Sequence, residues 1–141
     1  MIAEAIQARL LTRAGIVAAL ATHPFTTGAA TPAIFTIEPV GEDVAYPIIV
    51  ITEAGGPRWG SFESSGGFFE ADVEVRDQRD DRSTKSLRDL AQLVWEALDL
   101  ANLAVPGYHD VGTYADMPQE QEDDDGFPVF LIPTRTRLIA V

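Results

Sequence analysis

The sequence predicts an α+β domain with a mostly antiparallel sheet and two main helices packed on one face. Three segments carry this prediction. Residues 46–52 form a dense β-branched run, which is typical of a strand buried on both faces. Residues 68–76 alternate between apolar and charged side chains, as in a strand with one face in water. Residues 83–101 place apolar side chains at three- and four-residue steps, which indicates an amphipathic helix.

The remaining elements follow from shorter patterns. Residues 25–33 are rich in Pro, Gly and Thr, which predicts an exposed connection. Pro133 is expected to interrupt the last strand, because proline cannot donate a hydrogen bond to a β-ladder. The expected elements are an amphipathic helix over 2–13, a break or bend at Gly15, further helical turns over 16–20, a connection over 25–33, a short strand over 34–37, a strand over 108–114, an acidic loop over 116–126 and a final strand over 129–141.

Length and composition limit the function classes. A chain of 141 residues is large enough for one core and short for two, so we expect a single domain over residues 1–141. There is no cysteine, which excludes disulfides, thiolate nucleophiles and cysteine-based zinc sites. With 22 acidic and 10 basic residues the net charge is −12, which argues against tight binding to nucleic acid or anionic lipid. We expect neither a secretory signal nor a membrane-spanning segment.

Three carboxylates, Glu70, Asp72 and Glu74, project from one face of the predicted strand over 68–76. Such a cluster can bind a divalent metal, as in metal-dependent hydrolases. A solvated strand face is favoured over that alternative, because Arg76 on the same face already balances part of the charge. Calorimetric titration with magnesium or manganese separates the two.

The other candidate chemical motifs are incomplete. The acidic run at 120–126 fails the calcium-loop pattern, because Gln121 and Ile132 would stand where carboxylates are needed. His109 before Asp110 could be an oriented base, but no recognisable nucleophile accompanies it, and His23 is the only other histidine. We therefore assign no catalytic residue, no metal ligand and no cofactor.

Arg58, Trp59 and Phe62 stand in a glycine-rich segment between two predicted strands. Arginine and aromatic side chains are the types that anchor protein interfaces, so these three residues, together with Glu70, Asp72 and Glu74, form the candidate subunit interface. Two alternatives stay open: the aromatic side chains can fold back on their own core, or Trp59 and Phe62 can line the pocket of a ligand-binding module.

The order of these elements resembles the tail-terminator family of long-tailed phages and of phage-like gene-transfer particles. The resemblance is carried by the amphipathic stretch 3–11, the Tyr-Pro pair that opens the strand at 45–50, the strand 70–76 with the helix 83–98 after it, and the closing stretch 130–141. It covers most of the chain and consists of arrangement, without a catalytic signature.

The resemblance implies a structural virion protein, with no enzymatic activity, that forms a six-membered ring at the head-proximal end of a tail tube. Such a ring ends tube growth and joins the tail to the head. The implied partners are further copies of the chain, the tail tube protein and a neck or head-completion protein, and the implied location is the head-tail junction of a virion assembled in the host cytoplasm. DNA would pass through an acidic lumen without specific binding, since like charge prevents adhesion. Another neck or head-completion protein is the alternative.

Overall fold

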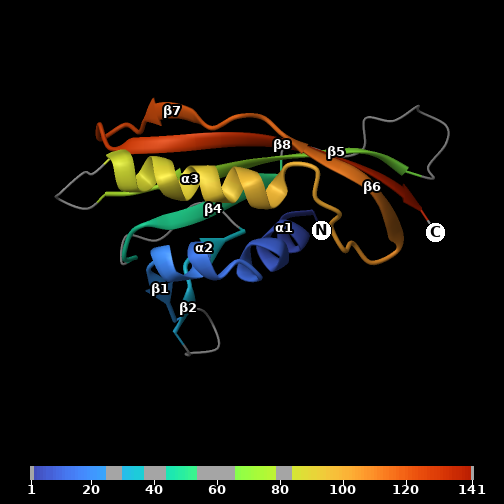
Figure 1. Cartoon of the computed structure of the whole chain (residues 1–141), viewed down its shortest axis with the longest axis horizontal. Helices are drawn as coiled ribbons and strands as arrows, with labels where there is room; N and C mark the ends of the chain where they lie inside the picture. The colour runs from blue at the N-terminus through green and yellow to red at the C-terminus, as the bar shows by residue number, and fades with distance from the viewer. Residues whose placement is uncertain (1, 25–29, 37–43, 54–65, 79–83, 141) are drawn as a thin grey trace.

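The computed structural model describes residues 2–24, 30–36, 44–53, 66–78 and 84–140, and Figure 1 shows their arrangement. The helices lie together on one side of a long twisted sheet, which confirms the predicted α+β class with helices on one face. The elements are α1 (Ile2–Leu11), α2 (Ala14–Ala19), β1 (Thr22–His23), β2 (Thr31–Pro32), β3 (Ile34–Phe35), β4 (Ile48–Glu53), β5 (Gly66–Arg76), α3 (Thr84–Leu98), β6 (Tyr108–Ala115), β7 (Gln119–Glu122) and β8 (Pro128–Ala140).

The main sheet has the strand order β3-β4-β5-β8-β6, and β7 also pairs with β8. Every pair in this sheet is antiparallel except β3 with β4. The central pair is β5 with β8, in continuous register from Gly66 opposite Ile139 to Arg76 opposite Val129. This register places the even-numbered residues of β5 on one face and its odd-numbered residues on the other.

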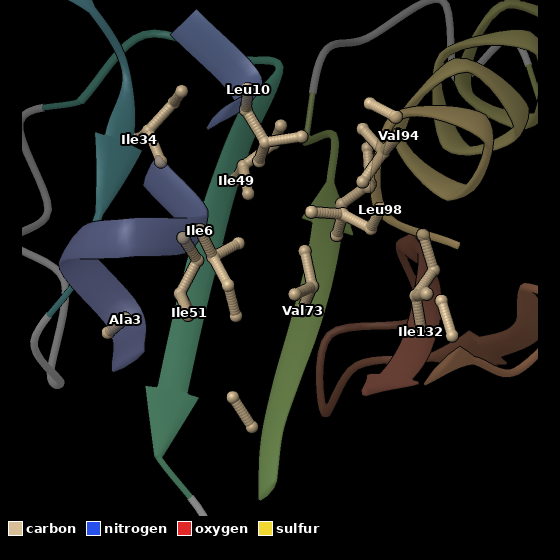
Figure 2. Close-up of a cluster of buried hydrophobic side chains, with 14 of the residues drawn as sticks. Ala3, Ile6, Leu10, Ile34, Ile49, Ile51, Val73, Val94, Leu98 and Ile132 are labelled. Carbon is tan, nitrogen blue, oxygen red and sulfur yellow. The ribbon is translucent and has the colours of Figure 1, made fainter. Parts of the chain in front are cut away.

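The core lies between the helices and the sheet, as Figure 2 shows. Ile6 and Leu10 of α1 and Val94 and Leu98 of α3 meet the inward side chains of the strands. The strand predicted over 46–52 is observed as β4, and its first four residues are fully buried, as expected for a strand covered on both faces. Its inward residues Ile49 and Ile51 join this core, together with Val73 of β5 and Ile132 of β8.

A smaller apolar cluster covers the opposite face of β4. It comprises Ala33, Phe35, Ile48 and Val50, with Ala21, Val44 and Tyr46 packed against it. Part of this cover comes from the segment expected to be an exposed connection, and that expectation is wrong at its end. Thr31 and Pro32 pair with β1, and Ala33 is fully buried. Backbone pairing and burial there depend on distant partners, which composition does not reveal.

Side-chain hydrogen bonds to backbone carbonyls connect the layers. Arg9 Nε in α1 donates to the carbonyl of Ala97 in α3 at 2.9 Å, and Gln7 Nε2 donates to the carbonyl of Ile34 at 3.0 Å. Trp95 Nε1 in α3 donates to the carbonyl of Ala115 at the end of β6 at 2.9 Å. These bonds satisfy backbone acceptors at element ends, where regular pairing stops.

The final strand runs through Pro133 without interruption, so the expected break is wrong. The Pro133 carbonyl accepts a hydrogen bond from Asp116 N at 2.9 Å, on the side of β8 that faces β6 and β7. The nitrogen of a strand residue points to the same side as its carbonyl. The proline nitrogen therefore faces the gap between the end of β6 and the start of β7, where no ladder bond to it is needed.

Strands β6 and β7 form one edge that runs antiparallel to β8, with two irregularities. The register shifts by one residue between Asp110 and Gly112, and by one more between Ala115, opposite Thr134, and Gln119, opposite Leu131. Each shift is the signature of a β-bulge, and Pro118 lies within the second. The outward backbone groups of Thr113 are bonded by Leu100 N and the Ala101 carbonyl.

Further boundaries differ from the sequence prediction. The first helix ends at Leu11, and the break expected at Gly15 comes earlier, at residues 12–13, because Gly15 lies within α2. The acidic stretch expected to be a loop contains β7, whose four residues are all exposed, so only its backbone pairing with β8 defines the strand. Helix α3 ends at Leu98, three residues before the predicted end, and Leu100 adopts a left-handed φ of 60°. Within the described ranges, no helix is long and apolar enough to cross a membrane.

The alternation along β8 yields a stability prediction. Ile132 is fully buried, whereas its neighbour Leu131 is half-buried on the other face. Ile132→Ala is expected to lower the free energy of unfolding by about 2–5 kcal/mol, because it leaves a cavity in the core. The matched control Leu131→Ala should cost less than half as much in the same urea titration. Equal losses would contradict the assignment of the two faces.

Candidate functional site

The outer face of the sheet, the face without helices, carries the charged and aromatic side chains of three adjacent strands. We define it by residues on β5, β8 and β6 whose register places them side by side. They are Phe68, Glu70, Asp72, Glu74 and Arg76 on β5, Leu131, Pro133, Arg135 and Arg137 on β8, and Tyr114 on β6. The β5 members are half-buried, while Tyr114 is 59% exposed.

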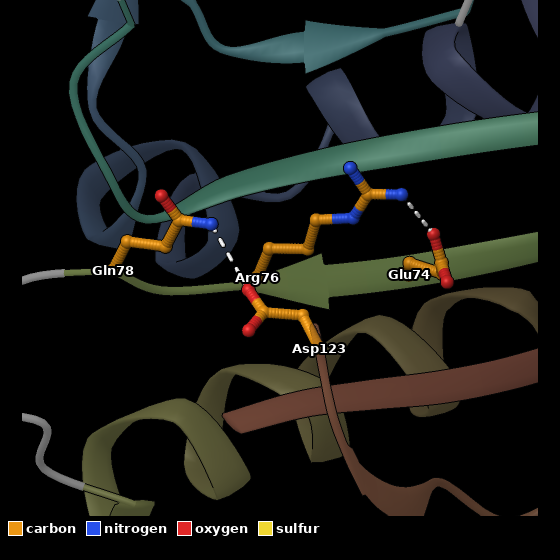
Figure 3. Close-up of polar contacts among 4 residues, drawn as sticks. All are labelled: Glu74, Arg76, Gln78 and Asp123. Carbon is orange, nitrogen blue, oxygen red and sulfur yellow. Dashed lines mark hydrogen bonds and ion pairs between the residues drawn. The ribbon is translucent and has the colours of Figure 1, made fainter. Parts of the chain in front are cut away.

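Arginines balance the two outer carboxylates of β5. Arg76 forms an ion pair with Glu74, as Figure 3 shows, and Arg135 Nε lies 3.6 Å from Glu70 Oε1 across the strand pair. The Arg135 guanidinium carbon also lies 5.6 Å from the ring centroid of Phe68, within the range of a cation–π contact. The cross-strand pair of Arg135 with Glu70 stabilises the pairing of β5 with β8 by a fraction of a kcal/mol, whereas Arg76 and Glu74 lie on the same strand.

Asp72 lies between these two ion pairs. The residue opposite it on β8 is Pro133, which is uncharged. Desolvation by burial raises the pKa of the Asp72 carboxyl above its ordinary value, and the neighbouring carboxylates of Glu74 and Glu70 raise it further. The face is thus charge-balanced at its two ends and carries excess negative charge in the middle.

A pocket of about 310 Å³ opens on the outer face next to Asp72. It combines carboxylates, one arginine and one aromatic ring. Its lining residues are Glu70, Asp72, Tyr114, Asp116, Pro133, Thr134 and Arg135. We call it the sheet pocket. Its chemistry fits polar and cationic protein groups, which carboxylates and an aromatic ring can contact together.

The three β5 carboxylates share one face, as predicted, but they do not form a metal site in the described part of the chain. There, no group of three or more His, Asp or Glu side chains is placed to hold a metal ion. The three carboxylates are spread along the strand, because residues on the same face are two positions apart. Two of them are directed to arginines: Glu74 to Arg76 and Glu70 to Arg135. The geometry gives no support to the hydrolase alternative.

The acidic corner between β7 and β8 has a structural explanation. Asp123 Oδ1 accepts backbone hydrogen bonds from Asp125 N and Phe127 N, both at 2.9 Å, and Gln78 Nε2 donates to Asp123 Oδ2 at 2.9 Å (Figure 3). Desolvation raises the pKa of Asp123, but these hydrogen bonds and the charge of Arg76 outweigh it, so the net shift is downward. Asp123 therefore closes the turn that connects the two strands.

Of the remaining predicted site residues, Arg58, Trp59 and Phe62 lie outside the described residues. His23 packs against the ring of Phe35, with a centroid distance of 5.0 Å, and His109 is exposed on β6. Sequence reasoning did not select Tyr114, Asp116 or Arg135. Cross-strand register brings these residues beside Asp72, and that register depends on bulges that no local pattern in the sequence announces.

No family model matches the sequence, and no curated protein sequence matches it. Among solved structures, the chain is similar to a chain in one described as "Virion of native gene transfer agent (GTA) particle". The TM-score is 0.70 and the sequence identity is 14%, and the match covers 99% of this chain and 94% of that chain. The two chains share a fold. At this identity the likeness concerns the path of the backbone over nearly the whole length of both proteins.

The raised pKa of Asp72 predicts a pH-dependent stability. The folded state disfavours the charged form of the Asp72 carboxyl, which lowers the free energy of unfolding once the carboxyl is ionised. This loss is absent below the unfolded pKa near 3.8, where the carboxyl is protonated in both states, and is complete once the pH has risen through the folded pKa. Asp72→Asn is therefore expected to be more stable than the parent protein at pH 7, with the difference vanishing toward pH 3.

The measurement is urea denaturation across pH 3 to 7. Asp89→Asn, at an exposed position of α3, is the control, because it removes one negative charge without a strand-face carboxylate cluster beside it. If the two variants show the same gain at every pH, the local cause assigned to Asp72 is wrong.

Proposed function

We propose that this chain is a structural virion protein that forms a six-membered ring at the head-proximal end of a phage-like tail tube. The ring ends tube growth and joins the tail to the head. The observation that carries the proposal is the similarity over 99% of the chain to a chain of a gene transfer agent virion. Fold similarity alone does not fix function, so the proposal also draws on charge and on the outer face.

The order of elements supports the same proposal. An N-terminal helix, a Tyr-Pro pair before a β-branched strand, a long alternating strand, a second helix and a C-terminal strand are the features by which the sequence resembles tail terminators. In the structure these segments are α1, β4, β5, α3 and β8, and they form one continuous core. These segments form the core of the domain, so the proposed role in assembly depends on the surfaces of the domain.

The net charge supports passage of DNA through the ring. At −12 the chain repels phosphates wherever its charge is not locally reversed, and a lumen with that property lets a genome slide without adhering. The proposed partners are therefore further copies of the chain, the tail tube protein and a neck or head-completion protein. DNA is a passing polyanion in this scheme, and the protein is located at the head-tail junction of the virion.

The outer face supplies the proposed subunit interface. Glu70, Asp72 and Glu74 contribute half-buried carboxylates there. The proposed interface also includes Arg58, Trp59 and Phe62, chosen from the sequence because arginine and aromatic side chains dominate binding energy at interfaces. A ring needs one patch that fits a different patch on the neighbouring copy. Partial burial makes the carboxylates suited to this, because a second subunit removes little additional water from them.

Negative-stain electron microscopy with tail tubes tests the function. Tube protein alone is expected to polymerise to broadly distributed lengths, and adding this protein should place an open-centred ring at one tube end and stop growth there. Rings that bind head portals and never tube ends would assign the protein to the neck instead. Tubes of unchanged length, with no ring in a concentration series with and without magnesium, would reject both roles.

Alanine substitution tests the proposed anchors. The triple variant Arg58→Ala, Trp59→Ala, Phe62→Ala should weaken ring assembly by about a hundredfold or more, since each anchor is expected to contribute on the order of 1–2 kcal/mol. Circular dichroism and thermal unfolding show whether the monomer still folds. The control is Gln92→Ala at a half-buried position of α3. Unchanged assembly in a folded triple variant would remove these residues from the interface.

A further inference from the structure

A groove opens on the helical side of the molecule. It has a volume of about 360 Å³ and lies between the turn that joins α1 to α2 and the outer side of α3. We call it the helix groove. Its lining residues are Thr12, Arg13, Ala14, Gly15, Ile16, Leu93, Glu96 and Ala97.

The helix groove has an apolar floor and two charged groups. Ile16 and Ala97 are buried beneath it, and Leu93 is 40% exposed along its wall. Arg13 and Glu96 are both exposed at its margin. Among the described residues, no ion pair engages the Arg13 guanidinium.

The opposite surface of the molecule presents the complementary features. Beside the second bulge, between β6 and β7, two large side chains are exposed: Tyr114 at 59% and Met117 at 60%. Asp116 lies between them in sequence, and Arg135 lines the adjacent sheet pocket. We call residues 114–117 the bulge knob.

The charges of the two surfaces match. Arg13 and Glu96 line the groove, and the sheet pocket beside the knob contains the carboxylates of Asp72 and Asp116 and the guanidinium of Arg135. For a chain of net charge −12, two copies repel unless charge is locally reversed at the contact. Arg13 provides that reversal beside an apolar surface.

We propose that the helix groove of one copy receives the bulge knob of the next copy. The Tyr114 ring and the Met117 thioether of the knob cover the apolar floor of the groove, while Arg13 pairs with Asp116 and Glu96 pairs with Arg135. The two surfaces lie on different sides of the molecule: Figure 1 shows the β6–β7 connection along one edge of the sheet, with α1 and α2 beyond α3.

Such a contact is head-to-tail, because groove and knob are different patches. A heterologous contact of this kind closes into a ring when the rotation between copies closes, and otherwise extends as a filament. The inference rests on the proposed ring and names the two surfaces through which its subunits meet. It concerns only described residues and adds to the interface proposed for the outer face.

Cysteine cross-linking tests the contact directly, because the chain has no cysteine of its own. Thr12→Cys in the groove and Met117→Cys in the knob, mixed as single variants, should form a disulfide-linked mixed dimer. Each variant alone should form far less, and the double variant should give a ladder that ends at the ring size. Asp89→Cys mixed with Met117→Cys is the control for background linkage at an exposed position of α3.

Charge reversal provides a second measurement. Arg13→Glu should weaken self-association by about tenfold or more in analytical ultracentrifugation, and Arg13→Glu with Asp116→Arg should restore it to within about threefold of the parent. Lys85→Glu, exposed on α3, makes the same change in net charge and should have little effect. An equal loss in Lys85→Glu, or no rescue in the double variant, would overturn the proposed pairing.

The outcomes separate this inference from the function on which it rests. If the parent protein forms rings but the mixed Thr12→Cys and Met117→Cys variants form no disulfide between them, the groove-knob contact is rejected and the ring stands. Links between two copies of position 12, or two copies of position 117, indicate a two-fold contact and also reject it. A protein that forms no ring, either free or on tube ends, rejects the contact and the proposed function together.

Discussion

The pairing of β5 with β8 is the constraint on which the rest of the structure depends. Eleven residues of β5 meet β8 in unbroken register, so the odd-numbered side chains of β5 must enter the core and its even-numbered side chains must face outward. A slip of one residue would bury Glu70, Asp72 and Glu74 among the helices, at a cost of several kcal/mol for each unpaired carboxylate. The alternation of apolar and charged residues therefore fixes both the core and the charge of the outer face.

The two faces of the sheet have different tasks as a result. The inner face is dry and closely packed, and its few polar side chains are satisfied: Thr134 Oγ1 donates to the Ala71 carbonyl at 2.8 Å, and the Thr113 and Thr136 hydroxyl oxygens lie 2.9 Å apart. No buried side-chain nitrogen or oxygen is left without a partner among the described residues. On the outer face the negative charge of Asp72 is not balanced by an arginine opposite it, which lowers the stability of the fold. In the proposed assembly, a basic group of another molecule can pair with this charge.

Much of the fold could be predicted from the sequence, because its strongest periodicities are local. The β-branched run of β4, the alternation of β5 and the helical repeat of α3 each identify an element without knowledge of its partners. The candidate site could be predicted only along one strand. Asp72 was visible beside Glu70 and Glu74, whereas Tyr114, Asp116 and Arg135 reach the same pocket through pairing across β8 and a bulge. Likewise, β7 exists through its pairing with β8 alone, and Pro133 is tolerated because of where the neighbouring strands end.

The irregular edge formed by β6 and β7 has a consequence for how the sheet meets other chains. An open strand edge invites another chain to add to the sheet and begin an aggregate. Here the segment after α3 bonds the outward groups of Thr113, Pro118 lies in the gap, and Glu120 and Glu122 place negative charge on the remainder. Backbone templating at this edge is thereby suppressed. In the proposed ring, the contacts between copies therefore depend on side chains and not on the addition of a strand.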